Sequence, residues 1–229
     1  MEEGYFQRTE LLLGAEAMRA LAEARVLLVG VGGVGSWCAE ALVRTGIGHL
    51  AIVDADRVCA SNVNRQLMAT PRTVGEPKVE VLARRLREIS PSAAITSVTG
   101  TYSADTAASF RLEEYGYVID AIDSVADKAY LIRHALSIPT VTLFSSMGAA
   151  RKIDPLRIRA SEFRKVVGDG LARALRNRFR KTGEFPCRKF TCVWSDEPPL
   201  AEGGTVMHVT AAFGLALASL VVRAVCAKG

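Results

Sequence analysis

The sequence RVLLVGVGGVGSWCAEALVR, residues 25–44, decides the fold. Its apolar run Val26–Val29 predicts a buried strand, and Ser36–Arg44 predicts an amphipathic helix that ends at Gly46. The turn between them carries four glycines: Gly30, Gly32, Gly33 and Gly35. Glycine lets a backbone approach a ligand closely, and the free amides at the start of a helix attract an anion, usually a phosphate. The stretch therefore predicts a nucleotide-binding turn between a strand and a helix.

A carboxylate follows the next apolar run. His49–Val53 predicts a second strand, and Asp54 comes at its end, about twenty residues after the glycine turn. A carboxylate at this position is well placed to accept hydrogen bonds from ribose hydroxyls. Gly30–Asp54 is therefore interpreted as a mononucleotide site, and the identity of the nucleotide stays open.

Strand-like and helix-like segments alternate up to about residue 150. The strand-like segments are Ala94–Thr99, Tyr117–Asp123 and Pro139–Phe144, and the helix-like ones are 79–89, Asp105–Glu113 and Val125–Ser137. This alternation predicts an α/β fold with a Rossmann-like, mostly parallel sheet and flanking helices. Ligands bind such sheets at the carboxyl ends of the strands, and the glycine turn, Asp54 and Asp123 are all expected there.

The chain is expected to form one domain in three parts. Residues 1–24 supply an N-terminal arm and helix, with the arm at Gln7–Glu10, and residues 25–150 form the nucleotide-binding unit. Residues 151–229 form a basic substrate-binding portion, which we expect to add a smaller C-terminal extension to the sheet.

Positive charge is concentrated in one segment. The chain of 229 residues has a net charge of +5, but residues 151–189 hold thirteen Lys and Arg against four Asp and Glu, a local +9. A basic segment on a nearly neutral body is typical of a protein with a polyanionic partner such as tRNA. The alternative is an ordinary solvated helix face, because the arginines of Leu171–Lys181 recur around leucines at helical spacing.

Cysteine usage and hydropathy predict a cytoplasmic protein. The five cysteines form no CxxC pair, which argues against a structural zinc site and for a reducing compartment. The opening residues are acidic and polar, unlike a secretory signal. The longest apolar tract, Val209–Val222, is short for a bilayer span, so we expect a buried or subunit-interface helix there and no membrane anchor.

Charged and amide side chains follow the glycine turn in an order that is unlike a nicotinamide-dependent dehydrogenase. They are Asp54, Asp56, Asn62, Asn64, Arg65, Gln66, Lys78 and Asp123. A triphosphate needs cations against its charge and a carboxylate for Mg²⁺, whereas a dinucleotide needs neither. Lys78 opens a predicted helix, where its charge opposes the helix dipole unless an anion binds beside it. These residues therefore indicate ATP and Mg²⁺.

This pattern resembles the ubiquitin-activating-enzyme-like adenylating superfamily, which includes the activators of the molybdopterin and thiamine sulfur carriers. Within it, the chain is similar to the tRNA threonylcarbamoyladenosine dehydratases. The segments that carry this likeness are RTELLLG (Arg8–Gly14), ALVRTGIGHLAIVD (Ala41–Asp54), VIDAIDSVADKAYLI (Val118–Ile132), SSMGAARKIDPLRI (Ser145–Ile158) and FGLALASLVV (213–222). The missing CxxC pair and the basic second half agree with this subfamily, since sulfur-carrier activators commonly have two such pairs.

The resemblance implies a role for each site residue. The glycines shape the loop, Asp54 holds the ribose, and Asp56, Asn64 and Gln66 belong to the same nucleotide site. Asn62, Arg65 and Lys78 contact phosphates, and Arg65 and Lys78 offset charge as pyrophosphate leaves. Asp123 holds Mg²⁺. Arg8 corresponds to an arginine that reaches into a neighbouring subunit's ATP site in relatives, which implies a homodimer.

The implied reaction is ATP-dependent adenylation of the threonylcarbamoyl carboxylate on a tRNA adenosine beside the anticodon, followed by cyclodehydration. One alternative is an adenylating activator of a small sulfur-carrier or ubiquitin-like protein, and another is a non-catalytic nucleotide-sensing or tRNA-binding module. Cys192 falls near the position of the cysteine in thioester-forming relatives, but its apolar neighbours favour a buried, inert thiol.

Overall fold

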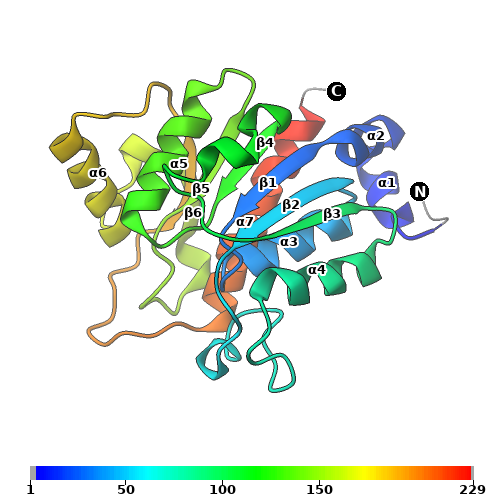
Figure 1. Cartoon of the computed structure of the whole chain (residues 1–229), viewed down its shortest axis with the longest axis horizontal. Helices are drawn as coiled ribbons and strands as arrows, with labels where there is room; N and C mark the ends of the chain where they lie inside the picture. Colours follow the sequence, from blue (N-terminus) through cyan, green and yellow to red (C-terminus); the bar gives the residue numbers. More distant parts are fainter. Residues whose placement is uncertain (1–3, 228–229) are drawn as a thin grey trace.

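The computed structural model describes residues 4–227, in which seven strands form one sheet (Figure 1). Its order is β3-β2-β1-β4-β5-β7-β6, and every neighbouring pair is parallel except the antiparallel pair β6–β7. The strands are β1 (Arg25–Val29), β2 (His49–Asp54), β3 (Ala94–Thr99), β4 (Tyr117–Asp120), β5 (Thr142–Ser146), β6 (Ile158–Glu162) and β7 (Thr191–Ser195). The predicted α/β class is confirmed, and β7 and β6 extend the sheet beyond β5.

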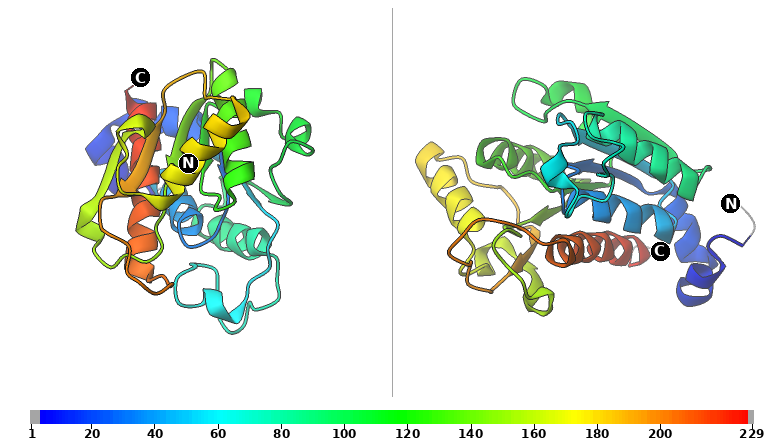
Figure 2. Two further views of the ribbon diagram at one scale, coloured as in Figure 1. Left: turned by 90° about the vertical axis from the view of Figure 1, so that its left-hand side faces the viewer. Right: turned by 90° about the horizontal axis from the view of Figure 1, so that it is seen from below.

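Seven α-helices surround the sheet. They are α1 (Gln7–Leu13), α2 (Ala15–Glu23), α3 (Gly35–Thr45), α4 (Lys78–Ile89), α5 (Val125–Ser137), α6 (Gly170–Thr182) and α7 (Met207–Cys226), within residues 4–227. Buried side chains of α2, α3, α4 and α7 form one core cluster, and those of α5 and α6 form a second. Figure 2 shows α3 and α7 on one side of the sheet and α5 on the other. The parallel strands are therefore covered on both faces, as their continuous apolar sequences require.

Helix α7 packs against α3 at a glycine. A Cβ atom on Gly214 would lie 2.3 Å from the carbonyl oxygen of Val34, so the two helices approach as closely as their backbones allow. This approach brings the first turns of α7 beside the glycine turn that precedes α3. The C-terminal helix thus contributes to the same edge of the sheet as the motif near the N-terminus.

Several predicted boundaries are wrong. The predicted polar arm Gln7–Glu10 is helical and belongs to α1, and the predicted helix Asp105–Glu113 consists of short 3-10 turns separated by Arg111 with a positive φ of 41°. Strand β4 ends at Asp120, so Asp123 lies in the loop that follows. Strand β5 begins at Thr142, three residues later than expected, because Ile138 and Val141 form a turn after α5.

Helix α7 is longer than the predicted apolar tract. Its 20 residues are enough to cross a membrane by length and composition, and half of its most apolar window is buried inside the protein. A buried core helix passes the same test, so this single helix is weak evidence for a membrane span. The sequence argument from a short tract underestimated the helix, because its first and last turns contain polar residues.

Candidate functional site

A cavity of about 540 Å³ opens at the carboxyl ends of the parallel strands. Its walls are the glycine turn after β1, the end of β2, the loop after β4 and the segment 146–150 after β5, with Thr210 of α7 closing one side. These elements meet because parallel strands place all their carboxyl ends at one edge. The cavity therefore lies where the sequence predicts the nucleotide site.

The glycine turn has no room for side chains at two of its positions. A Cβ on Gly35 would lie 1.8 Å from the carbonyl oxygen of Gly30, and one on Gly30, whose φ is 89°, would lie 2.6 Å from that of Ala121. Gly32 and Gly33 line the cavity itself, whereas Gly35 does not. Gly30 and Gly35 thus set the shape of the turn, while Gly32 and Gly33 leave backbone open to a ligand.

Asp54 holds the turn in place from the end of β2. One carboxylate oxygen accepts a hydrogen bond from the amide of Val31 at 2.8 Å, and the other accepts one from the amide of Asp56 at 2.9 Å. Each oxygen keeps a second lone pair, and Asp54 lines the cavity. Its position suits an acceptor for ribose hydroxyls.

Lys78 begins α4 and forms an ion pair with Asp56. Its Nζ lies 2.7 Å from Asp56 Oδ2; the lysine side chain is 7% exposed and that of Asp56 is 70% exposed. The anion that the helix dipole requires beside Lys78 is therefore supplied by the chain itself. Because Asp56 stands in solvent while Lys78 lines the cavity, an anionic ligand can reach the lysine from the cavity side.

Arg65 and Gln66 face the cavity, and the two asparagines beside them do not line it. Arg65 donates to the carbonyl of Ser61 at 2.8 Å and to Asn64 Oδ1 at 2.9 Å. Asn62 accepts from the amide of Cys59, and Asn64 donates to the carbonyl of Thr205, so both organise loops. Gln66 is buried, and its Oε1 has no hydrogen-bond donor within residues 4–227. A donor on a bound ligand would satisfy this oxygen.

Asp123 lines the cavity on a loop that is fixed from below by a buried ion pair. Lys128 and Asp120 are both fully buried, and Lys128 Nζ lies 2.8 Å from Asp120 Oδ2. Lys128 also donates to the carbonyl of Ile122 at 2.9 Å, and Asp120 accepts from the Ser145 hydroxyl at 2.6 Å. The pair therefore ties the loop after β4 to α5 and β5. Sequence reasoning missed Lys128, although a lysine inside an apolar helix face is a usable signal.

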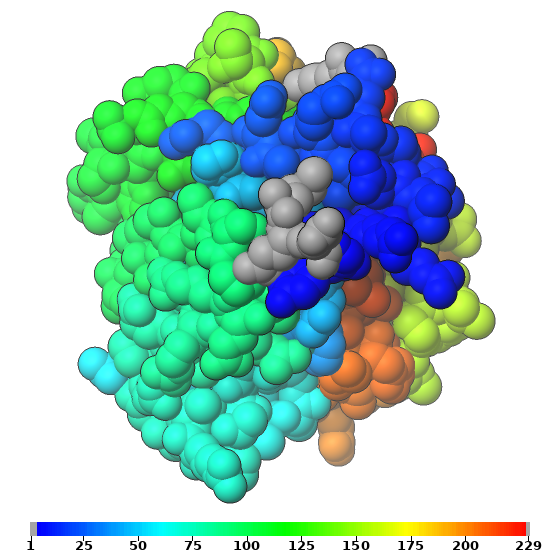
Figure 3. Space-filling model, turned by 90° about the vertical axis from the view of Figure 1, so that its right-hand side faces the viewer, coloured from blue at the N-terminus to red at the C-terminus, as the bar shows by residue number. Residues whose placement is uncertain are grey.

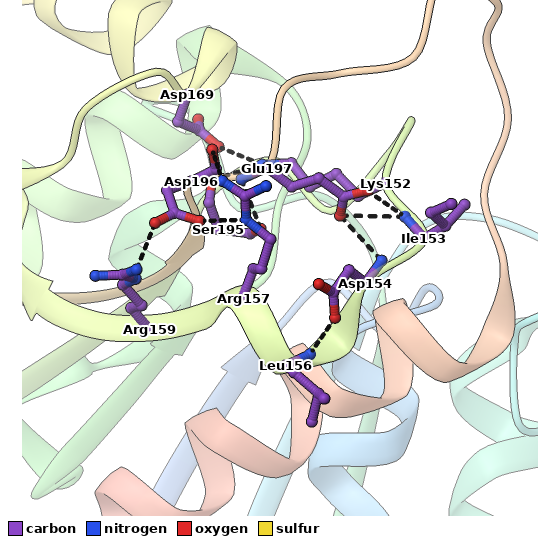
Figure 4. A network of polar contacts seen from close by, with 10 residues as sticks. All are labelled: Lys152, Ile153, Asp154, Leu156, Arg157, Arg159, Asp169, Ser195, Asp196 and Glu197. Carbon is purple, nitrogen blue, oxygen red and sulfur yellow. Dashed lines mark hydrogen bonds and ion pairs between the residues drawn. The ribbon is translucent and has the colours of Figure 1, made fainter.

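A second polar network supports the wall formed by residues 146–150 (Figure 4). Asp169 accepts hydrogen bonds from the amides of Gly148 at 3.1 Å and Ala172 at 2.8 Å, which links this wall to the start of α6. Lys152 lies 3.8 Å from Asp169 and donates to the carbonyl of Ser195 at 2.7 Å. Burial lowers the pKa of Lys152, while the Asp169 carboxylate opposes that shift. The basic segment is thus attached directly to the cavity.

Arg8 lies away from the cavity of its own chain. It is exposed on α1, which packs on α2, and α2 leads directly into the amino end of β1. The cavity lies at the opposite, carboxyl edge of the same strand. Arg8 can therefore meet a nucleotide site only in another subunit.

The basic segment divides into structural and free cations. Arg176 donates to the carbonyls of Phe163 and Val166, and Arg188 to those of Leu136 and Ile138, so both guanidinium groups are held by the protein. The exposed arginines of α6 are Arg173, Arg178 and Arg180, which we name the α6 patch. Only part of the predicted basic surface is thus available to a polyanion.

Cys192 is buried in the middle of the extended sheet. Its side chain is fully buried in β7, and burial raises the pKa of the thiol far above its usual range. A thiol in this state is a poor nucleophile. The structure therefore agrees with the expectation of an inert cysteine.

The fold and this cavity define a Rossmann-like nucleotide-binding protein. The chain belongs to the ThiF family, whose model matches residues 6–228. The resemblance to the ubiquitin-activating-enzyme-like superfamily is thereby confirmed.

Curated relatives and a solved structure narrow the likeness. The chain is 44% identical over 177 residues to tRNA threonylcarbamoyladenosine dehydratase of Escherichia coli, a match that covers 76% of this chain and 65% of that protein. It is 39% identical over 195 residues to the enzyme of the same name from Bacillus subtilis, covering 85% of this chain and 76% of the relative. A crystal structure of the E. coli enzyme in complex with ATP superposes with a TM-score of 0.92 at 38% identity, covering 98% of this chain and 94% of that one.

Replacing Lys128 with methionine tests the buried ion pair. The Lys128→Met variant leaves the Asp120 carboxylate buried without its cation, and we expect it to lose about 3–5 kcal/mol of unfolding free energy. The exposed pair Arg84–Glu76 provides the control, since Arg84→Met should cost less than about 1 kcal/mol. Urea unfolding of both variants measures the difference, and equal losses would show that the buried pair does not stabilise the loop.

Proposed function

We propose that this chain uses ATP to adenylate the carboxylate of a threonylcarbamoyl group on a tRNA adenosine beside the anticodon, and that the activated group then cyclises with loss of water. One observation carries the proposal: the glycine turn, Arg65, Lys78 and Asp123 all face one cavity at the carboxyl edge of the sheet. The relatives that share most of this chain bear the name of an enzyme with that tRNA substrate, and one of them is solved with ATP.

The lining residues suit the parts of ATP. In the proposal, Gly32 and Gly33 leave backbone open to the phosphates, and Asp54 accepts from the ribose. Arg65 and Lys78 supply positive charge where pyrophosphate leaves. The unpaired amide oxygen of Gln66 requires a donor from the ligand, which is independent support for a bound molecule at this position.

Asp123 would hold Mg²⁺ together with the phosphates. No group of three or more His, Cys, Asp or Glu side chains in residues 4–227 could hold a metal ion without outside ligands. This is compatible with magnesium, which commonly uses one or two carboxylates plus the phosphates of its nucleotide. The ion would offset the charge of the triphosphate, and Asp123 would fix its position.

The protein's own contribution to the reaction is positioning and charge stabilisation. A carboxylate resists attack because it is charged and resonance-stabilised. Transfer of the α-phosphoryl group turns one carboxylate oxygen into part of a leaving group, AMP, and releases pyrophosphate. A nitrogen of the same substrate then attacks the acyl carbon and closes a five-membered ring, with the advantage of an intramolecular reaction. No protein nucleophile is required, which agrees with the inert Cys192.

Pyrophosphate exchange into ATP tests the function and separates it from its main alternative. We expect exchange to be stimulated by tRNA that carries the threonylcarbamoyl group and not by a sulfur-carrier protein ending in Gly-Gly. Lys78→Ala and Asp123→Asn should each lower AMP formation at least about 100-fold, because each removes charge stabilisation at the phosphates. The exposed residues Lys165 and Asp105 provide matched controls as Lys165→Ala and Asp105→Asn.

Circular dichroism and thermal unfolding establish that the variants retain the fold. Exchange that occurs only with the carrier protein would overturn the tRNA assignment. Wild-type turnover in Lys78→Ala or Asp123→Asn would overturn the roles of these residues, with the tRNA assignment left standing.

We also propose that tRNA follows the α6 patch to the cavity, a substrate that would place the enzyme in the cytoplasm. Helix α6 starts at the cavity, which Leu171 lines, and its exposed arginines lead away from it. Arg176 is excluded from the patch, because its guanidinium group is bonded to backbone carbonyls.

Reversing the α6 patch tests this path. The combined Arg173→Glu, Arg178→Glu and Arg180→Glu variant should bind tRNA at least about tenfold more weakly, with a salt dependence reduced by up to about three phosphate contacts. Arg19→Glu, Arg84→Glu and Arg111→Glu change the net charge equally at exposed positions elsewhere. Equal losses in the two triple variants would assign the effect to net charge alone, and ATP affinity should stay unchanged in both.

We further propose a homodimer in which α1 brings Arg8 to the partner's cavity. Leu11 and Leu12 on α1 are 78% and 82% exposed, and Leu215 on the outer side of α7 is 51% exposed. Figure 3 shows the face where the N-terminal helices, in blue, border α7, in red and orange. Exposed leucines on this scale are typical of a surface that a second subunit covers.

Charge at this face should prevent dimer formation. Leu12→Glu should yield monomers in sedimentation velocity, with AMP formation reduced as in Arg8→Ala. Leu156 is 92% exposed on another part of the surface, and Leu156→Glu should leave the assembly unchanged. A monomeric wild-type protein with full activity would contradict the role of Arg8.

A further inference from the structure

A second cavity, of about 330 Å³, lies at the far end of α6. It is bounded by the end of β6, the last turns of α6 and the loop 185–190 that leads into β7. Three buried phenylalanines form its base: the rings of Phe163 and Phe190 stack at 4.9 Å, and Phe179 meets Phe163 edge-on at 6.3 Å. This packing makes the base of the cavity rigid.

The rim of the second cavity combines an exposed aromatic ring with free cations. Phe185 is 61% exposed, which is unusual for a large apolar side chain beside a cavity. Arg164 and Lys189 stand in solvent with side chains 81% and 75% exposed, and their closest approaches to Glu162 are only 4.0 and 3.9 Å. Arg180 completes the rim. A ligand with a flat face and a negative charge would match this rim.

Glu162 adds an acceptor at the wall. Its Oε1 is buried and has no hydrogen-bond donor within residues 4–227, and the residue lines the cavity. A buried carboxylate oxygen without a donor costs free energy that a ligand N–H group would recover. The three features together require a planar heterocycle that carries an amino group and a phosphate.

We propose that the second cavity is a subsite for an unpaired nucleotide of the substrate RNA, with the base stacked on Phe185, its exocyclic amino group donating to Glu162, and its phosphate at Arg164, Arg180 and Lys189. The inference rests on the proposed function. Arginine and aromatic side chains in one pocket are the usual means of binding an unstacked RNA base, and a carboxylate accepts from the amino group of cytosine.

The geometry of α6 links the two cavities. Its 13 residues span roughly 20 Å at 1.5 Å per residue, with Leu171 at the first cavity and Phe179 and Arg180 at the second. The α6 patch lies between them. A stem-loop that places its adenosine in the first cavity can therefore extend another loop nucleotide along the patch into the second, which would let the enzyme select its RNA at a position remote from the reaction.

RNA stem-loops with matched loops test the subsite. Both keep the adenosine beside the anticodon, and the other loop nucleotides are all cytidine in one and all uridine in the other. Fluorescence anisotropy with the full chain should show about tenfold tighter binding of the cytidine loop, because only cytosine offers an amino group to Glu162. Phe185→Ala should weaken binding of both loops about tenfold, and Phe185→Tyr, which keeps the ring, should not.

Glu162→Gln should remove the preference for cytidine and retain the affinity for the uridine loop. Leu156→Ala is the control for loss of an exposed apolar side chain. Wild-type affinities in Phe185→Ala, or an unchanged preference in Glu162→Gln, would overturn the subsite while RNA binding and the proposed function stand. If the wild-type chain binds neither stem-loop nor modified tRNA, the proposed function fails as well.

Discussion

The contact between Gly35 and the carbonyl of Gly30 is the constraint on which the site depends. A Cβ at Gly35 would lie 1.8 Å from that oxygen, so the chain can turn from β1 into α3 this tightly only with glycine. The turn directs the start of α3 toward the cavity, and the bond from Val31 to Asp54 fixes the turn to β2. Nucleotide recognition therefore follows from two backbone contacts before any cation is considered.

The opposite wall depends on charges that are buried for structural reasons. Lys128 and Asp120 sit below the loop that carries Asp123, and Lys152 and Asp169 sit behind the segment that contains Gly148. Buried ion pairs contribute little net stability but impose one geometry, because either charge alone is costly. The enzyme thus has a preorganised cavity, which is what catalysis by positioning requires.

The sequence was informative where local geometry has a local cause. The glycine turn, Asp54 and the alternation of strands and helices depend on neighbouring residues, and the parallel sheet they predict is confirmed. It failed where tertiary contacts decide. Lys78 was predicted to need an anion, but the sequence did not show that Asp56 supplies one. Asn62 and Asn64 were assigned to the nucleotide with Arg65, yet their amides are used to order loops, a distinction that only the folded chain reveals.

The most direct test of adenylation follows one oxygen atom. If tRNA carrying ¹⁸O in the threonylcarbamoyl carboxylate is turned over with ordinary ATP, the oxygen that attacks the α-phosphorus leaves with AMP. Mass spectrometry should then find AMP that contains one ¹⁸O atom, together with unlabelled pyrophosphate. Label recovered in inorganic phosphate with ADP, or AMP free of ¹⁸O, would contradict transfer of the α-phosphoryl group to the carboxylate.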